Sequence, residues 1–408
     1  MTRARVLFVD DEPRILDGLR RSLHGKRGDW DMAFVTSGAE ALDLLAESPR
    51  DVVVSDLRMP GMDGAELLTR VSERHPGVAR VVVSGDAERE EALRGAVAGH
   101  RFLAKSAEAD SIVAVIDQLA FMTSTTHRVE ARRLAGAVRA LPTLPGHADR
   151  LTALLGSAAI ELSTAARAAA RDVGLTAKLL QLSNSAVFGA RARVASVENA
   201  IGVLGLPTLQ ALVDTGQLLW SSPQWGPAVV RELGVVWRHA MATTELVGLM
   251  ASPANRPYAQ AAASLQDVGR FVCLAAAGSG GNPDLDLAAA DFRGVPYRDV
   301  GVELLHLWGL PYPIVVAVAE RDLPQRPPAS GLGVTAAVRA AHLLIQQTEA
   351  RDPGARTAAE ELAELLAHPQ LTAQPVDWRR AAEEASARAG EWLIGDMGLN
   401  RADEKKRA

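Results

Sequence analysis

The stretch Val52–Gly64, VVVSDLRMPGMDG, begins with three successive apolar residues and passes through Asp56 into a loop rich in turn-forming residues. A short run that is apolar at every position is typical of a strand that helices cover on both faces. Four further runs of this kind are each followed by an amphipathic segment of helix length: Val6–Val9, Met32–Val35, Val81–Val83 and Phe102–Leu103. The alternation predicts an α/β domain from Arg3 to about Met122, a flavodoxin-like, doubly wound parallel sheet of five strands.

Polar residues stand at the ends of these predicted strands. Asp10 and Asp11 end the first strand and Asp56 ends the third, while Ser84 and Lys105 follow the fourth and fifth. In the strand order 2-1-3-4-5, ligands bind outside the carboxyl ends of the first and third strands. Any one of these aspartates alone would be typical of a strand end or a helix cap. As a set, they predict three carboxylates that converge at one edge of the sheet.

Three neighbouring carboxylates repel one another, so the arrangement calls for a cation. Mg²⁺ is the expected ion because it takes one or two carboxylates, keeps several waters and leaves room for phosphate oxygens. In such a site Asp56 can attack phosphorus while the Lys105 ammonium offsets charge on the equatorial oxygens. Ser84 can donate a hydrogen bond to the new phosphoryl group.

Residues 1–122 resemble the receiver domain of two-component response regulators. The motifs that carry the resemblance are FVDDEP with the acidic pair, SDLRMPGMDG around Asp56, VVVSGD with Ser84, and FLAKS with Phe102 and Lys105. The resemblance implies that Asp11, Asp56 and the backbone carbonyl of Arg58 bind Mg²⁺, with Asp10 assisting through water, and that Ser84 and Phe102 form a conformational switch. Ser106 departs from the family, which usually has proline after the lysine.

After Met122 the strand signal stops and helical patterns continue to the end of the chain. The clearest helical stretches are Ser163–Ala170, Leu175–Leu182, Leu233–Met250, Ala259–Ala277 and Val300–Leu307. We expect a helical linker over residues 123–140, an all-helical output domain over 141–328, and a C-terminal helical extension over 329–408. The predicted fold class is therefore α/β plus all-α.

The helical region resembles the HDOD domain, an output module related to HD-type metal phosphohydrolases. The segments that carry this resemblance include DVGLTAKLLQLSNSAVFG (172–189), LQDVG (265–269) and VGVELLHLWGLPYPI (300–314). An HD-type hydrolase holds its metal through several histidines and a His-Asp pair. His239 and Asp267 are present, but Gln266, Tyr297 and the pair Glu320-Arg321 stand where histidines are expected. The module is thus expected to be non-catalytic, and the alternative is one metal held by His239, Asp267 and Glu320.

Composition excludes several other classes of protein. The chain has 408 residues, of which 48% are hydrophobic and 23% charged, with a formal net charge of −5. This balance gives no basic surface for nucleic acid, and no apolar run is long enough to predict a membrane span. The single cysteine, Cys273, excludes an intrachain disulfide, and the N-terminus lacks the apolar core of a signal peptide. A cytoplasmic protein is expected.

The leading functional hypothesis is a phosphorylation-controlled switch with no enzymatic activity beyond Mg-dependent self-phosphorylation and autodephosphorylation at Asp56. Its expected partners are a sensor histidine kinase and an unknown downstream protein. The resemblance to receiver domains also allows a homodimer that forms through the face of the fourth helix, fifth strand and fifth helix. The competing hypothesis is a metal-dependent HD-type phosphodiesterase or phosphohydrolase that acts on a cyclic dinucleotide or nucleotide. A third is a domain that binds a nucleotide without cleaving it.

Overall fold

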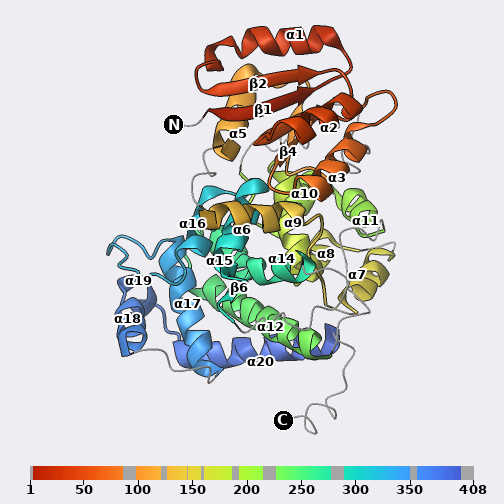
Figure 1. Ribbon diagram of the computed structural model, residues 1–408. Helices are drawn as coiled ribbons and strands as arrows, with labels where there is room; N and C mark the ends of the chain where they lie inside the picture. The colour runs from red at the N-terminus through yellow and green to blue at the C-terminus, as the bar shows by residue number, and fades with distance from the viewer. Residues whose placement is uncertain are drawn as a thin grey trace. The chain divides into compact units, whose positions relative to one another are not determined.

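The computed structural model describes residues 3–85, 98–120, 126–144, 146–157, 160–185, 193–214, 227–276, 289–349 and 356–396. The chain folds into two compact units. The first holds the predicted α/β domain, and the second holds most of the helical region (Figure 1). Within the described residues, no helix is long and apolar enough to cross a membrane.

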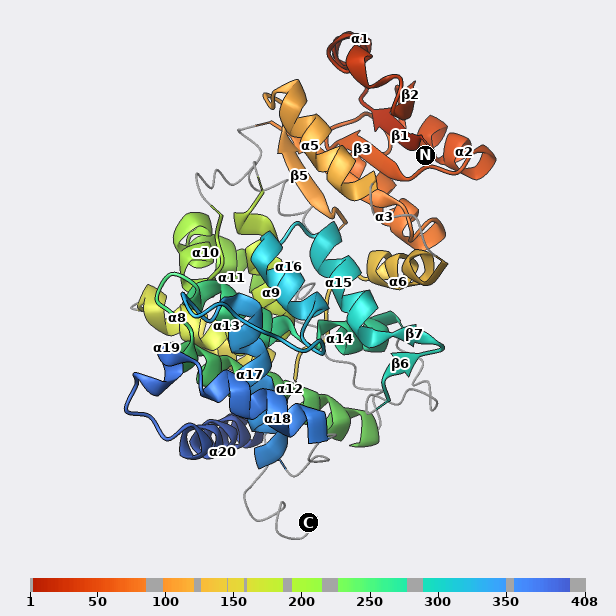
Figure 2. The ribbon, with the colours of Figure 1, turned by 90° about the vertical axis from the view of Figure 1, so that its left-hand side faces the viewer.

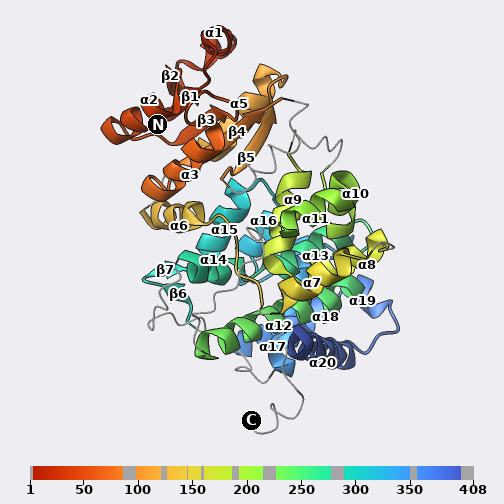
Figure 3. The same cartoon turned by 90° about the vertical axis from the view of Figure 1, so that its right-hand side faces the viewer.

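The α/β part is a five-stranded parallel sheet in the order β2-β1-β3-β4-β5, which confirms the predicted topology. The strands are β1 Ala4–Val9, β2 Trp30–Val35, β3 Val52–Asp56, β4 Ala79–Ser84 and β5 Arg101–Ala104. Helices α1 Pro13–Ser22, α2 Gly38–Glu47, α3 Gly64–Arg74 and α5 Ala109–Ala120 connect or follow them, and η1 His24–Lys26 is one 3₁₀ turn. Helix α5 covers one face of the sheet, and α2 and α3 cover the other (Figure 3).

Local sequence explains where these helices begin. Ser37 precedes α2 and its hydroxyl accepts the backbone N–H of Glu40. Asp63 precedes α3 and its carboxylate accepts the N–H of Glu66 at 2.8 Å. Each cap satisfies a backbone donor that the first turn of a helix leaves without an intrahelical partner. The start of α3 is therefore fixed directly after the loop that carries Asp56.

Part of the predicted linker belongs to the α/β unit. Helix α6, Thr126–Ala137, contacts α3, and the buried guanidinium of Arg132 donates to the carbonyls of Leu119 at 2.8 Å and Gly77 at 3.0 Å. Gly77 precedes β4 and Leu119 lies near the end of α5, so Arg132 bonds to the edge of the sheet opposite Asp56. Residues 86–97, which include the predicted fourth helix of the receiver, lie outside the described residues.

The helical unit is built around the long helix α12, Pro227–Met250, which contacts α13, α17 and α20 (Figure 2). The helices from α7 to α14 are α7 His147–Leu155, α8 Leu162–Ala169, α9 Val173–Ser183, α10 Val197–Leu204, α11 Leu206–Asp214, α12, α13 Arg256–Leu265 and α14 Val268–Ala276. Those from α15 on are α15 Tyr297–Leu307, α16 Tyr312–Ala319, α17 Val334–Thr348, α18 Arg356–Leu366, α19 Pro369–Thr372 and α20 Trp378–Asp396. The described part of the helical unit also contains a small antiparallel hairpin, formed by β6 Asp291–Phe292 and β7 Val295–Pro296.

The segment predicted as one helical stretch over Ala259–Ala277 is two helices, α13 and α14, which a turn at Gln266–Asp267 separates. The carbonyl of Gln266 accepts a hydrogen bond from the Arg321 guanidinium at 3.1 Å, so a side chain from a distant segment is one of its partners. Just beyond the turn, a Cβ on Gly269 would lie 1.8 Å from the carbonyl oxygen of Tyr297. This close approach of α14 to α15 requires glycine.

Candidate functional site

Three aspartates meet at the carboxyl ends of β1 and β3. Asp10, Asp11 and Asp56 each offer a carboxylate oxygen, and these atoms all lie within 4.8 Å of one another. Asp10 and Asp56 are buried, whereas Asp11 is partly exposed. Burial raises the pKa of the Asp10 carboxyl; the Glu12 N–H and Lys105 act to lower it, and the charges of Asp56 and Asp11 act to raise it further.

Lys105 follows β5 and reaches into this group. Its Nζ lies 2.8 Å from Oδ2 of Asp56 and 3.8 Å from Oδ2 of Asp10. Its backbone N–H donates to the carbonyl of Ser84 at 2.8 Å, which fixes the lysine beside the end of β4. Burial acts to lower the pKa of Lys105, but the hydrogen bond and the charge of Asp56 outweigh it and raise the pKa. This geometry is present with Ser106 in place of the usual proline, and no peptide bond within the described ranges is cis.

The chemistry of this donor set fits a divalent cation such as Mg²⁺. The three side chains offer hard oxygen ligands, and one lysine alone does not balance their charge. A cavity of about 400 Å³ adjoins the group and leaves space for water and for phosphate oxygens. Its lining includes Asp11, Leu57, Arg58, Met59, Pro60, Asp63 and Ala65. Arg58 thus lies in the loop that borders the cavity.

Ser84 and Phe102 lie on neighbouring strands, and both are buried. In the register of β4 and β5, Ser84 pairs with Ala104 and Val82 pairs with Phe102. Side chains two residues apart in a strand point to the same face of a sheet. Ser84 and Phe102 therefore project on the same face of the sheet.

The backbone of Asp56 is held at close range by the start of α3. A Cβ on Gly64 would lie 1.9 Å from the carbonyl oxygen of Asp56. The N–H of Gly64 also donates to the carbonyl of Leu57 at 2.9 Å. Only glycine permits this approach. Gly64, the last residue of SDLRMPGMDG, therefore helps to position Asp56, the candidate phosphoacceptor.

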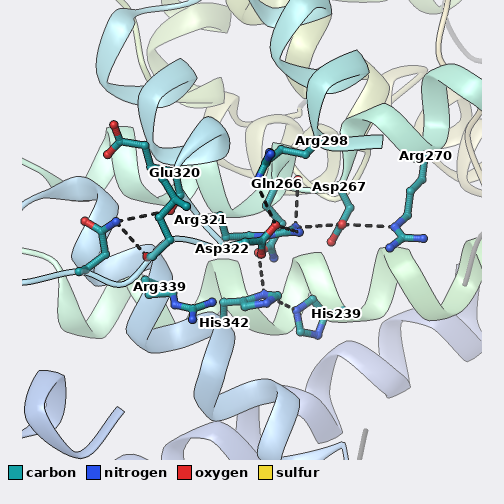
Figure 4. A network of polar contacts seen from close by, with 12 residues as sticks. His239, Gln266, Asp267, Arg270, Arg298, Glu320, Arg321, Asp322, Arg339 and His342 are labelled. Atoms are coloured by element: carbon teal, nitrogen blue, oxygen red, sulfur yellow. Dashed lines mark hydrogen bonds and ion pairs between the residues drawn. The ribbon is translucent and has the colours of Figure 1, made fainter. Parts of the chain in front are cut away.

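In the helical unit, a second polar network surrounds the turn at Gln266–Asp267 (Figure 4). The carboxylate of Asp267 lies 2.9 Å from the Arg321 guanidinium and 3.4 Å from Nε of Arg270. Burial acts to raise the pKa of Asp267, but Arg321 and Arg270 hold it well below its usual range. The buried carboxylate is therefore charged, and arginine supplies the opposite charge.

Two histidines complete this network, one from α12 and one from α17. Nε2 of His239 lies 2.9 Å from Nδ1 of His342, and Nδ1 of His239 lies 3.0 Å from the carboxylate of Glu349. Because a carboxylate only accepts, Nδ1 of His239 donates to Glu349. Nδ1 of His342 also lies 3.1 Å from the amide oxygen of Gln266, so its proton has two neighbouring acceptors, this oxygen and Nε2 of His239. Burial, assisted by the charge of Arg321, lowers the pKa of His342 well below 6.5.

The structure does not bring together the alternative metal set of His239, Asp267 and Glu320. Within the described part of the chain, the side chains that come close enough to hold a metal in a group of three are those of Asp10, Asp11 and Asp56, and the alternative set is not among them. Glu320 directly follows α16, and its carboxylate points away from Asp267 (Figure 4). The Arg270 guanidinium lies 4.8 Å from the ring centroid of Tyr297, where a histidine ligand was expected.

Two family models match separate parts of the chain. The family model of the response regulator receiver domain matches residues 6–117, and that of the HDOD domain matches residues 141–324. Residues 6–117 are a receiver domain, and residues 141–324 are an HDOD domain.

Among curated proteins, the hydrogenase transcriptional regulatory protein HoxA of Cupriavidus necator is 42% identical over 93 residues, 23% of this chain and 19% of HoxA. The DNA-binding transcriptional regulator NtrC of Escherichia coli is 34% identical over 119 residues, 29% of this chain and 25% of NtrC. The chain thus spans about a fifth to a quarter of the length of these relatives.

Two solved structures illustrate the range of similarity. The signal receiver domain of an HD domain-containing protein from Pseudomonas fluorescens is 27% identical with a TM-score of 0.28, and the match covers 29% of this chain and 95% of that domain. The MmoQ response regulator from Methylococcus capsulatus is 20% identical with a TM-score of 0.47, covering 60% of this chain and 98% of MmoQ.

The sequence did not predict several residues of the polar network around the turn at Gln266–Asp267. His342 and Glu349 lie beyond residue 324, in or directly after α17, and the sequence pattern marked Arg321 only as a replacement for histidine. One signal was available for His342: it is a histidine among alanines and leucines in a helical pattern, and a buried histidine needs a hydrogen-bond partner. Its partner, His239, is 103 residues away in the sequence.

Proposed function

We propose that this protein is a phosphorylation-controlled response regulator in which Asp56 accepts a phosphoryl group from a sensor histidine kinase. The observation that carries the proposal is the buried Asp56 carboxylate, 2.8 Å from the Lys105 ammonium and grouped with Asp10 and Asp11. The receiver domain itself implies interaction with a histidine kinase.

In the proposed reaction, a carboxylate oxygen of Asp56 attacks the phosphorus of a phosphohistidine. The new P–O bond forms as the P–N bond breaks, and the leaving imidazole recovers neutrality by taking a proton from solvent. Lys105 balances negative charge on the phosphoryl oxygens, and the Ser84 hydroxyl donates a hydrogen bond to one of them. Attack of water on the acyl phosphate later releases inorganic phosphate and restores Asp56.

Asp11, Asp56 and the carbonyl of Arg58 are the proposed Mg²⁺ ligands, with Asp10 acting through water. The ion would neutralise charge on the transferring phosphoryl group. The proposed switch then moves Ser84 toward the phosphoryl group and lets Phe102 follow, which alters the surface near β5 and α5. A homodimer that forms through this surface is part of the proposal, and the fourth-helix portion of that surface lies outside the described residues.

The HDOD domain is proposed to act through protein contacts on a downstream partner, without catalysis. Its support is the charge balance at Asp267: Arg321 and Arg270 compensate the carboxylate that an HD-type hydrolase would give to a metal. In addition, α17 contacts α12, α13 and α16, so residues after 328 add to the same helical core. This supports an output unit that extends into the C-terminal helices.

The test is phosphorylation by acetyl phosphate with Mg²⁺, in the wild type, Asp56→Asn and the control Asp43→Asn, an exposed aspartate of α2. The proposal expects one hydroxylamine-labile phosphoryl group in the wild type and the control, and none in Asp56→Asn. Labelling of Asp56→Asn to the same extent would overturn it. Hydrolysis of a cyclic dinucleotide that disappears in His239→Ala and Asp267→Ala would instead show a catalytic output domain.

A further inference from the structure

A separate pocket lies inside the helical unit, away from the Asp267 network and with no lining residue in common with it. Its volume is about 290 Å³, at the small end of the range of ligand pockets. Residues of α8, α9, α10, α12 and α13, and of the segment before α10, line it. Small side chains such as Ala166, Ala170, Ala195 and Ala261 form much of the wall, which is why space remains among five helices.

Two buried hydroxyls in this wall lack hydrogen-bond partners. Thr176 and Ser264 are each 3% exposed, and neither Oγ has a partner among the described residues. Hydroxyls in helices commonly bond to the carbonyl one turn back, as Thr244, also in the wall, does to Ala240 at 2.7 Å. Since Thr176 and Ser264 make no such bond, both carry unused hydrogen-bonding capacity at the pocket. A buried polar group without a partner is costly, so a bound group that satisfies both would be favoured.

The charges at the pocket favour an uncharged ligand. Arg167 and Glu198 are the charged residues in the wall; both are exposed, and their charges are opposite. The buried lining is apolar or hydroxyl-bearing, with Leu180 and Val197 among the apolar residues. An ion placed there would lose its hydration without gaining a buried counter-charge.

We propose that this pocket binds a small, uncharged, largely apolar molecule whose oxygen or nitrogen atom hydrogen-bonds to the hydroxyls of Thr176 and Ser264. The inference is independent of the proposed phosphorylation of Asp56. It gives the HDOD domain a ligand site of its own, separate from the position of the metal in HD-type hydrolases.

Acetanilide is a suitable probe because it joins an apolar ring to one uncharged amide, and benzoate is its charged counterpart. Binding to the full-length chain is followed by methyl NMR, with Ala166, Ala261 and Val197 as reporters inside the pocket. The proposal expects saturable shifts of these methyl groups with acetanilide, and at least tenfold weaker binding of benzoate.

Two variants distinguish specific binding of acetanilide in the pocket from non-specific binding elsewhere on the protein. Thr176→Val with Ser264→Ala removes both hydroxyls at nearly constant volume and is expected to weaken acetanilide binding by at least about tenfold, because both proposed hydrogen bonds are lost. Ala261→Phe fills the pocket and should abolish binding. The control Thr152→Val alters an exposed threonine whose hydroxyl bonds to Ala148, and it should bind as the wild type does.

Three outcomes would overturn the proposal. The first is no saturable binding of acetanilide, which would leave a pocket filled by water only. The second is unchanged affinity in the double hydroxyl variant, and the third is shifts that persist in Ala261→Phe or spread over the protein surface. Because the double variant keeps the side-chain volumes, the test stands even if Ala261→Phe fails to fold.

Discussion

The guanidinium of Arg321 lies 2.9 Å from the carboxylate of Asp267, and both side chains are about nine-tenths buried. An HD-type hydrolase would use this carboxylate to hold a metal, whereas here a cation of the chain itself compensates it. The pair supports the proposal that the HDOD domain is non-catalytic, because a metal would have to displace an arginine that also bonds to Gln266 and Asp322.

Removal of Arg321 should destabilise the HDOD domain strongly. Arg321→Met leaves Asp267 buried with less compensation, and loss of one partner of a buried ion pair typically costs about 3–5 kcal/mol. Urea unfolding of the full-length chain measures the loss. Arg380→Met, which breaks the exposed pair with Glu384, is the matched control and should change stability by less than about 1 kcal/mol. Equal effects of the two substitutions would contradict the assigned role of the buried pair.

Mild acid should destabilise the same domain through His342. Its pKa is lowered in the folded chain, so the unfolded state binds a proton more readily below about pH 6.5. The stability of the folded state therefore falls as the pH drops from about 6.5 toward the folded pKa, by at most about 1.4 kcal/mol per pH unit for one group. Unfolding curves between pH 7.5 and 5 test this. His342→Gln should flatten the dependence, and an unchanged slope in that variant would assign the effect to other groups.

Phosphorylation should depend on a divalent cation and on Asp11. Chelation with EDTA is expected to stop labelling by acetyl phosphate, because three carboxylates with a single lysine leave charge uncompensated. Asp11→Asn should raise the Mg²⁺ concentration needed for half-maximal rate about tenfold or more. The control is Asp17→Asn, an exposed aspartate of α1. Full labelling in EDTA would exclude the proposed metal site.

Gly64→Ala should disturb the phosphoacceptor residue although it changes no polar group. The added Cβ would meet the carbonyl oxygen of Asp56 at 1.9 Å, so the start of α3 must move. Overpacking of this kind costs about 1–3 kcal/mol, and the rate of phosphorylation should fall with the displacement of Asp56. Gly18→Ala in α1 meets nothing within 4 Å and should be neutral or stabilising by up to about 1 kcal/mol. Equal losses of stability and of phosphorylation rate in the two variants would show that the contact between Gly64 and the Asp56 carbonyl has no effect.

Helix α6 should be held to the receiver by Arg132. Arg132→Met removes the donors for the carbonyls of Leu119 and Gly77, which costs about 1–3 kcal/mol. Amide hydrogen exchange in α6 should become faster, with little change in the helical unit. Arg133→Met, in which the replaced side chain is 65% exposed, is the neighbouring control. Unchanged protection of α6 in Arg132→Met would show that other contacts hold this helix.

The grouping of the three aspartates was predictable because these residues are tied to strand ends. Asp10, Asp56 and Ser84 each end or directly follow a buried run, and parallel strands bring their carboxyl ends to one edge of the sheet. Strand order and the meeting of the carboxylates therefore followed from local pattern and a topological rule. The tight contact between Gly64 and Asp56 could not be predicted, because backbone approach depends on the placement of α3.

The sequence by itself determined the two-part organisation, the parallel sheet and the positions of the acidic residues, because strand and helix periodicity are local properties. The partners of Asp267 and His239 were decided by the tertiary structure alone. Arg321 lies 54 residues beyond Asp267, and His342 lies 103 residues beyond His239. No local pattern encodes such pairings: they form because the packing of α12, α16 and α17 buries these groups together, and buried charges and imidazoles must find partners there.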